Sequence, residues 1–148
     1  MGKPEVWEDW LPLRAGSPHR YRFEEPDLLI VRDDGDVSGA DMARMYDLVE
    51  EFAARLRRRL FWITDISRLG RVTEEAGKVS IARDLKPHLR GSIVCGGSFH
   101  QRHLANMVVK AMRVLRPERG KGNMVFCATV AEARAIAEEQ RRRSSGSS

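Results

Sequence analysis

Short apolar runs alternate along this chain with longer segments in which apolar residues recur every three or four positions. This alternation restricts the possible folds more than any other feature of the sequence. Five runs have the length and composition of β-strands, and they cover residues 20–25, 27–35, 60–63, 92–95 and 124–127. Helical periodicity fills the intervals after the second run, beginning near Ser38, Thr73, Ser98 and Thr129. The sequence therefore predicts the element order β-β-α-β-α-β-α-β-α.

This order predicts an α/β fold built on a mostly parallel sheet with about four helices. Strands that alternate with helices pair in parallel through right-handed crossovers. Only Glu25-Pro26-Asp27 separates the first two runs, so we expect a hairpin that adds an antiparallel edge strand. A chain of 148 residues fits one domain. We assign it to residues 19–143, with an N-terminal arm over 1–18 and a flexible Ser/Gly tail over 144–148.

The net charge of +5 is concentrated in two arginine clusters. One covers residues 55–59 and the other residues 141–143, and both lie at predicted helix ends. Basic side chains are favoured at the C-terminal end of a helix by its dipole. Because no aromatic stacking motif or zinc-finger spacing accompanies the clusters, we expect no binding to nucleic acid.

The two cysteines, Cys95 and Cys127, each lie inside an apolar run. We expect buried, reduced thiols rather than a disulfide or a zinc site. His100 and His103 share a predicted helix face, but the sequence offers no third ligand, so we expect no metal and no other cofactor. No apolar run is long enough to cross a bilayer, and the first ten residues lack the apolar core of a signal peptide. We therefore expect a cytoplasmic protein.

The segment FWITDISRLGRVTEEAG, residues 61–77, adds a local motif to this element order. Together the order and the motif resemble the STAS family, named after sulfate transporters and anti-sigma-factor antagonists, and within it the SpoIIAA-like branch. The Asp-Ile-Ser sequence at residues 65–67 is similar to the Asp-hydrophobic-Ser sequence that ends the third strand in that branch. Thr73 and the two glutamates after it stand where those proteins have a phosphorylatable Ser or Thr. The same topology is also similar to that of the lipid-binding CRAL-TRIO domain.

The resemblance implies a partner-binding surface with a phosphorylation switch. It places Asp65, Ser67, Thr73 and Glu74 on or beside a loop over residues 65–75. Thr73 would be the switch, or else Ser67. A phosphate at a helix N-terminus meets free backbone N–H groups and adds nearly two negative charges. The alternative is that Thr73 is an ordinary N-cap and that Asp65 and Ser67 form a polar turn.

Gly96, Gly97 and Ser98 follow a predicted strand and precede a predicted helix. A glycine pair in this position allows an anion or another ligand to approach the backbone. A tight strand-to-helix turn explains the same residues. The segment has neither the glycine spacing of a dinucleotide site nor the Lys-Ser/Thr pair of a P-loop.

Two functions from different classes remain open. The first is a non-enzymatic bacterial regulatory module that resembles anti-sigma-factor antagonists. It would bind a protein partner, such as an anti-sigma factor or a kinase-like protein, through the 65–75 loop and the following helix. The second is an apolar-ligand, lipid or membrane-surface binder, suggested by the Met-rich helices, Trp7, Trp10 and the basic clusters. No acid, base and nucleophile converge in the sequence, so we expect no catalytic residues.

Overall fold

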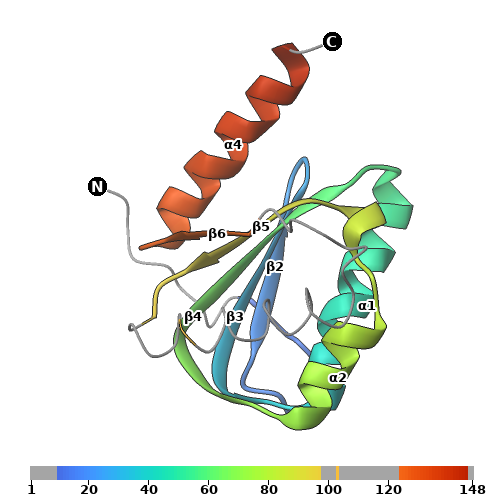
Figure 1. The fold of residues 1–148 in the computed structure, drawn as a ribbon, viewed down its shortest axis with the longest axis vertical. Helices are drawn as coiled ribbons and strands as arrows, with labels where there is room; N and C mark the ends of the chain where they lie inside the picture. The colour runs from blue at the N-terminus through green and yellow to red at the C-terminus, as the bar shows by residue number, and fades with distance from the viewer. Residues whose placement is uncertain (1–9, 98–102, 104–123, 147–148) are drawn as a thin grey trace.

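The computed structural model describes residues 10–97, 103 and 124–146, which form one mixed sheet with helices on both faces (Figure 1). The sheet has six strands in the order β1-β2-β3-β4-β5-β6. Their bounds are β1 (Leu11–Pro12), β2 (Arg20–Glu24), β3 (Leu28–Val37), β4 (Leu60–Val72), β5 (Leu89–Cys95) and β6 (Met124–Cys127). β1, β2 and β3 pair antiparallel, whereas β3, β4, β5 and β6 pair in parallel. The predicted α/β architecture with an antiparallel N-terminal edge is confirmed.

The described α-helices begin close to the predicted starts. They are α1 (Gly39–Leu56), α2 (Glu74–Ala82) and α4 (Val130–Gly146). A 3-10 helix, η2 (Lys86–His88), was not predicted. α1 opens with a capping box in which the Ser38 hydroxyl accepts from the Asp41 N–H at 3.1 Å, and the Asp41 carboxylate accepts from the Ser38 N–H at 2.9 Å. The helix predicted over residues 98–115 lies outside the described residues. α4 runs to Gly146, three residues into the segment that we assigned to the tail.

Each face of the sheet has its own apolar core. Successive strand residues point to opposite faces, so Leu29 and Val31 of β3 pack with α1 and α2, whereas Leu28 and Ile30 pack with α4. The fully or nearly buried side chains that α4 contributes are Val130, Ala133 and Ala137. The runs of consecutive apolar residues in β3 and β4 are explained by this burial on both faces.

The end of the predicted N-terminal arm is part of the packed structure. Leu11 pairs with Tyr21 across β1 and β2. The buried side chain of Trp10 joins the core under α4, and that of Leu13 joins the core under α1. Residues 10–13 therefore contribute to both faces of the sheet.

Two ion pairs dock α4 on the β2–β3 hairpin. Arg134 forms a bidentate pair with Glu24 at 2.8 and 2.9 Å. Arg141 donates two hydrogen bonds to Asp27, one of them at 3.3 Å, and Arg90 lies 3.4 Å from the same carboxylate. The Asp27 side chain is fully buried, so a position of α4 without this pair would leave a buried charge with the more distant Arg90 alone. The orientation of α4 is thus set by charge as well as by apolar packing.

β4 is much longer than the predicted strand over residues 60–63. It runs for 13 residues to Val72, so the prediction of a loop over residues 65–75 was wrong. The second half of β4 continues to pair with β3, with Asp34 opposite Arg68 and two register shifts along the way. Ile66 and Leu69 are buried in the core under α1, and their burial is the physical reason that the strand continues.

β3 and β4 therefore continue beyond β5, which ends beside Asp65 at Cys95. We call this two-stranded part, residues 33–37 and 66–72, the β3–β4 extension. It leads directly into the first turns of α1 and α2.

Candidate functional site

Three of the predicted site residues, Asp65, Ser67 and Gly96, meet where β5 ends beside β4. The Asp65 carboxylate accepts a hydrogen bond from the Ser67 backbone N–H at 2.9 Å. A Cβ added to Gly96 would lie 2.9 Å from Asp65 Oδ1 and 3.0 Å from the Ser67 Cβ. Gly96 also has a φ of 74°, so both its backbone conformation and its close approach to β4 require glycine.

The backbone of Gly96 is used inside the fold. Its N–H donates to the carbonyl oxygens of Cys127 and Ala128, at 3.3 and 3.0 Å. Gly97 continues the turn with a φ of 83°, and Ser98 lies outside the described residues. Because the Gly96 N–H already has two acceptors, the geometry favours the tight turn over an anion site.

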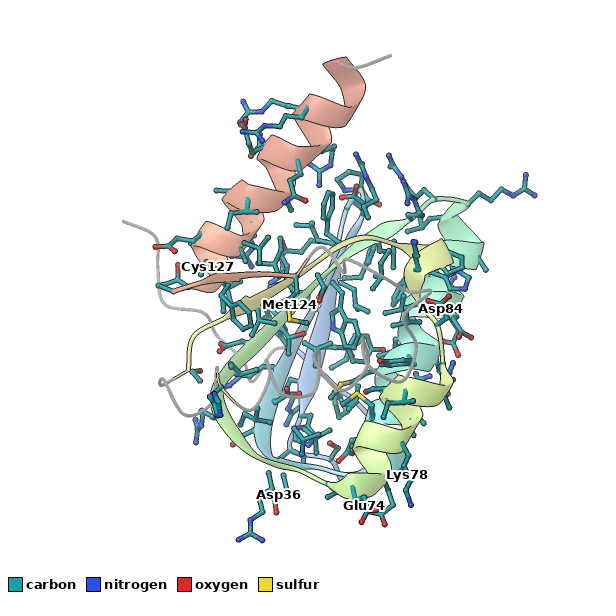
Figure 2. All side chains as sticks on the ribbon, viewed as in Figure 1. Asp36, Glu74, Lys78, Asp84, Met124 and Cys127 are labelled. Carbon is teal, nitrogen blue, oxygen red and sulfur yellow. The ribbon has the colours of Figure 1, made fainter. Side chains whose placement is uncertain are left out.

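Thr73 and Glu74 lie at the far end of the β3–β4 extension, and Figure 2 shows Glu74 at the lower edge of the molecule. The Thr73 hydroxyl accepts from the Ala76 N–H at 3.1 Å, so Thr73 is the N-cap of α2. Glu74 is exposed and lies 3.7 Å from Lys78 one turn later. Ser67 and Thr73 are six residue steps apart along extended backbone, a separation of roughly 20 Å. The predicted residues therefore form two groups rather than one.

One face of the β3–β4 extension is exposed, and it connects these two groups. It carries Ser67, Arg68 and Arg71 from β4. Arg68 lies 3.5 Å from the Asp34 carboxylate, and the Asp36 carboxylate accepts from the Arg71 backbone N–H at 2.8 Å. We call these five residues the extension face. The extension face carries charges of both signs, and the opposite side of its two paired strands is buried in the core.

Asp33 is a buried acid at the bulge between Arg32 and Asp34. Burial raises the pKa of Asp33 to about 8, and the negative charges of Asp65 and Asp41 contribute to the increase. Within the described residues its Oδ1 has no hydrogen-bond partner. Asp33 is therefore mainly protonated at pH 7. Acids with such a shift are typical of functional sites and also of strained structural positions.

His19 and Asp41 form a second buried polar group at the base of the extension. His19 Nδ1 accepts from the Asp34 N–H at 2.9 Å, and Nε2 lies 2.9 Å from the Asp36 carbonyl oxygen, so the ring has the geometry of the neutral Nε2–H tautomer. Burial opposes ionisation of Asp41, but hydrogen bonds from the N-cap and from Arg14 hold its pKa below the usual value. Both side chains are engaged in holding the extension and α1 together.

The two cysteines lie opposite each other on β5 and β6, and neither forms a disulfide. Cys95 is buried and Cys127 is half-buried. Burial raises the pKa of the Cys95 thiol, which makes it a poor nucleophile.

Within residues 10–97 and 124–146, no cluster of three or more His, Cys, Asp or Glu side chains is arranged to hold a metal ion. In the same part of the chain, no helix has both the length and the hydropathy needed to span a membrane.

No protein-family model matches the sequence, and no curated protein matches it. Solved structures do match. The anti-sigma factor antagonist SpoIIAA, in its unphosphorylated form, superposes with a TM-score of 0.56 at 12% identity, over 81% of this chain and 97% of that chain. An uncharacterized protein of the DUF3478 family from Shewanella loihica PV-4, described as having a SpoIIAA-like fold, superposes with a TM-score of 0.55 at 16% identity, over 80% and 90%. The chain has a SpoIIAA-like fold, which is the fold of STAS domains.

Proposed function

We propose that this protein is a regulatory module that binds a partner protein through the extension face and the N-terminus of α2. The observation that carries the proposal is the length of β4. It presents Ser67, Arg68 and Arg71 to solvent from a strand whose opposite side is buried under α1 and α2. A binding surface built on paired strands holds its side chains in a narrower range of positions than a loop does.

The likeness to SpoIIAA supports a protein partner and a phosphorylation switch as the mode of action. SpoIIAA is an anti-sigma factor antagonist with an unphosphorylated form. Ser67 is the exposed hydroxyl of the extension face, whereas the Thr73 oxygen already caps α2. A phosphate on Ser67 would add nearly two negative charges beside Arg68 and would change the charge that a partner meets. We propose Ser67 as the first hydroxyl to test and Thr73 as the second.

Site-specific photo-crosslinking in the producing cells tests this proposal. A crosslinking residue in place of Arg71 should give a discrete protein adduct, whereas the same residue in place of the exposed Glu138 on α4 should not. Adding Ser67→Glu should reduce the Arg71 adduct at least severalfold, and Ser67→Ala should leave it unchanged. Equal adducts from positions 71 and 138, or an adduct insensitive to both serine variants and to Thr73→Glu, would refute the proposal.

A further inference from the structure

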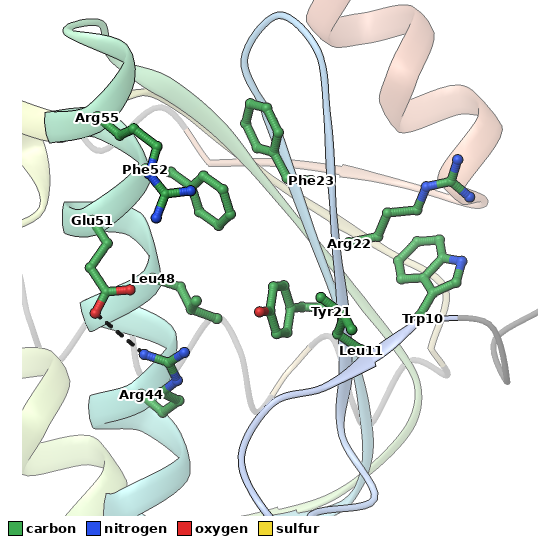
Figure 3. Close-up of a pocket in the computed structure, with 10 residues that line it drawn as sticks. All are labelled: Trp10, Leu11, Tyr21, Arg22, Phe23, Arg44, Leu48, Glu51, Phe52 and Arg55. Carbon is green, nitrogen blue, oxygen red and sulfur yellow. Dashed lines mark hydrogen bonds and ion pairs between the residues drawn. The ribbon is translucent and has the colours of Figure 1, made fainter.

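A groove of about 490 Å³ lies between α1 and the outer edge of β2 (Figure 3). Arg44, Leu48, Phe52 and Arg55 line it from one stripe of α1, because residues three or four apart share a helix face. This stripe is roughly 16 Å long at about 1.5 Å per residue. Phe23 of β2 stacks on Phe52 with 4.7 Å between the ring centroids, and this stack forms part of the groove wall.

Three arginines and one glutamate line the groove, so its charge is predominantly positive. The Arg55 guanidinium lies 5.3 Å from the Phe52 ring centre, and the Arg22 guanidinium lies 5.7 Å from that of Trp10. Arg22 also lies 3.6 Å from the Glu24 carboxylate. Guanidinium groups held against aromatic rings keep in-plane N–H donors for carboxylates.

The Arg44 guanidinium contacts a backbone carbonyl group and Glu51, the one glutamate that lines the groove. Its Nε donates to the Leu13 carbonyl oxygen at 3.2 Å, and its Nη1 lies 3.4 Å from Glu51. Figure 3 shows Glu51 and Arg44 facing each other along α1. Glu51 therefore occupies the position that an external carboxylate would take on Arg44.

The lining residues lie on both sides of β2 rather than on one face of the sheet. Figure 3 shows Phe52 and Arg44 on the α1 side, and Arg22 with Trp10 across the strand. Among the described residues, β1 pairs with the outer side of β2 at Tyr21 and Arg20, and no described strand pairs with that side at residues 22–24. Such an edge is a template for another strand.

We propose that the outer edge of β2 binds an extended acidic segment of a partner protein as an added strand. Side chains of an added strand alternate between the two faces of the sheet. Acidic side chains on one face would meet Arg22, and those beside α1 would meet Arg44 and Arg55. A bulky apolar side chain would pack on the Phe23–Phe52 stack and on Leu11, a residue that is 57% exposed.

A protein segment fits these observations better than a small amphipathic anion does. A small anion bound on the α1 side would not reach Arg22 and Trp10, whereas a strand along the edge contacts both faces. The positive lining complements acidic side chains, and backbone pairing with β2 adds affinity that does not depend on sequence.

A display library of random peptides, about nine residues long, selected on the immobilised full chain provides the test. We expect the enriched peptides to combine Asp or Glu with aromatic or branched aliphatic residues. In a titration of an enriched synthetic peptide, Arg55→Gln should weaken binding about fivefold. Arg58→Gln, which removes the same charge at an exposed position outside the groove, should have no effect. The backbone amides of residues 22–24 that point away from β3 should gain protection from hydrogen exchange in the complex.

Glu51→Gln separates specific recognition from loss of folding. Removing the one acid of the groove should strengthen peptide binding about threefold, because Arg44 no longer has an internal competitor. Enriched peptides without acidic residues, equal weakening by Arg55→Gln and Arg58→Gln, or binding that leaves the amides of residues 22–24 unprotected would overturn the inference. It does not rest on the proposed function, and Ser67→Glu should leave peptide binding unchanged.

Discussion

Asp33 makes the stability of this protein depend on pH in an unusual direction. Its pKa is about 8 in the folded protein, against 3.8 for an unperturbed side chain, because burial and two nearby carboxylates disfavour the charge. Between these two pH values the folded chain binds one more proton at this site than the unfolded chain does. The free energy of unfolding should therefore fall as pH rises, by about 1.4 kcal/mol per pH unit from this group.

The substitution Asp33→Asn removes this titration while keeping the shape of the side chain. From pH 5 to pH 8 the single group accounts for a loss of up to about 4 kcal/mol in the wild-type protein. Rearrangement around a buried charge lowers such a penalty, so we expect about 2 to 4 kcal/mol. The buried amide of the variant adds its own cost at every pH, and the informative quantity is therefore the difference between the two pH values.

Urea unfolding at pH 5 and pH 8 measures this difference for the wild type, for Asp33→Asn and for Asp34→Asn. Asp34 is the matched control, since it is the next residue, half exposed, and loses the same charge. We expect the wild type and Asp34→Asn to lose stability in parallel towards pH 8, and Asp33→Asn to lose less by the stated amount. Parallel curves for all three proteins would refute the assignment of a buried, protonated Asp33.

Two further matched pairs test the packing of the fold by urea unfolding. Gly96→Ala should destabilise the protein by about 2 kcal/mol, because a positive φ and a close approach to β4 both exclude a Cβ. Gly77→Ala, in the middle of α2 with open space around it, should stabilise by about 0.5 to 1 kcal/mol, and destabilisation there would contradict the described helix. Arg141→Ala should cost about 3 kcal/mol because it leaves the buried Asp27 with one partner. Arg142→Ala, which removes an exposed pair, should change stability by less than about 0.5 kcal/mol, and equal losses in the two variants would refute the docking of α4 through Asp27.

Apart from the short strand β1 and the 3-10 helix η2, which were not predicted, the described strands and helices could be predicted because each has a local signal. The buried runs around residues 60–63, 92–95 and 124–127 are short and apolar, and the capping pair Ser38 and Asp41 marks the start of α1. These signals depend on neighbours in the sequence. They are strongest where burial repeats every two residues or every three to four.

The β3–β4 extension and the candidate site could not be predicted in the same way. After Asp65 the buried residues are Ile66 and Leu69, with serine and arginine between them and glycine and arginine after them, which is the composition of a loop. The strand forms because β3 continues beside it through two register shifts, and such pairing is a long-range property. Asp33 was missed for the same reason, since its surroundings come from three separate elements. The groove along β2 could not be predicted either. Its residues come from α1, β2 and the segment around β1, and the α1 residues alone have the pattern of an ordinary helix surface.

The salt bridge between Asp27 and Arg141 joins positions 114 residues apart, and this separation bears on how the chain is made. During synthesis the strands of the sheet emerge before α4. The apolar residues that α4 contacts and the Asp27 carboxylate are therefore made well before the helix that packs on them. Until then the nascent chain lacks the apolar contacts that α4 makes with the sheet, and of the two arginines that pair with Asp27 only Arg90 has been made. The second face of this domain can therefore close only after translation has passed Arg141.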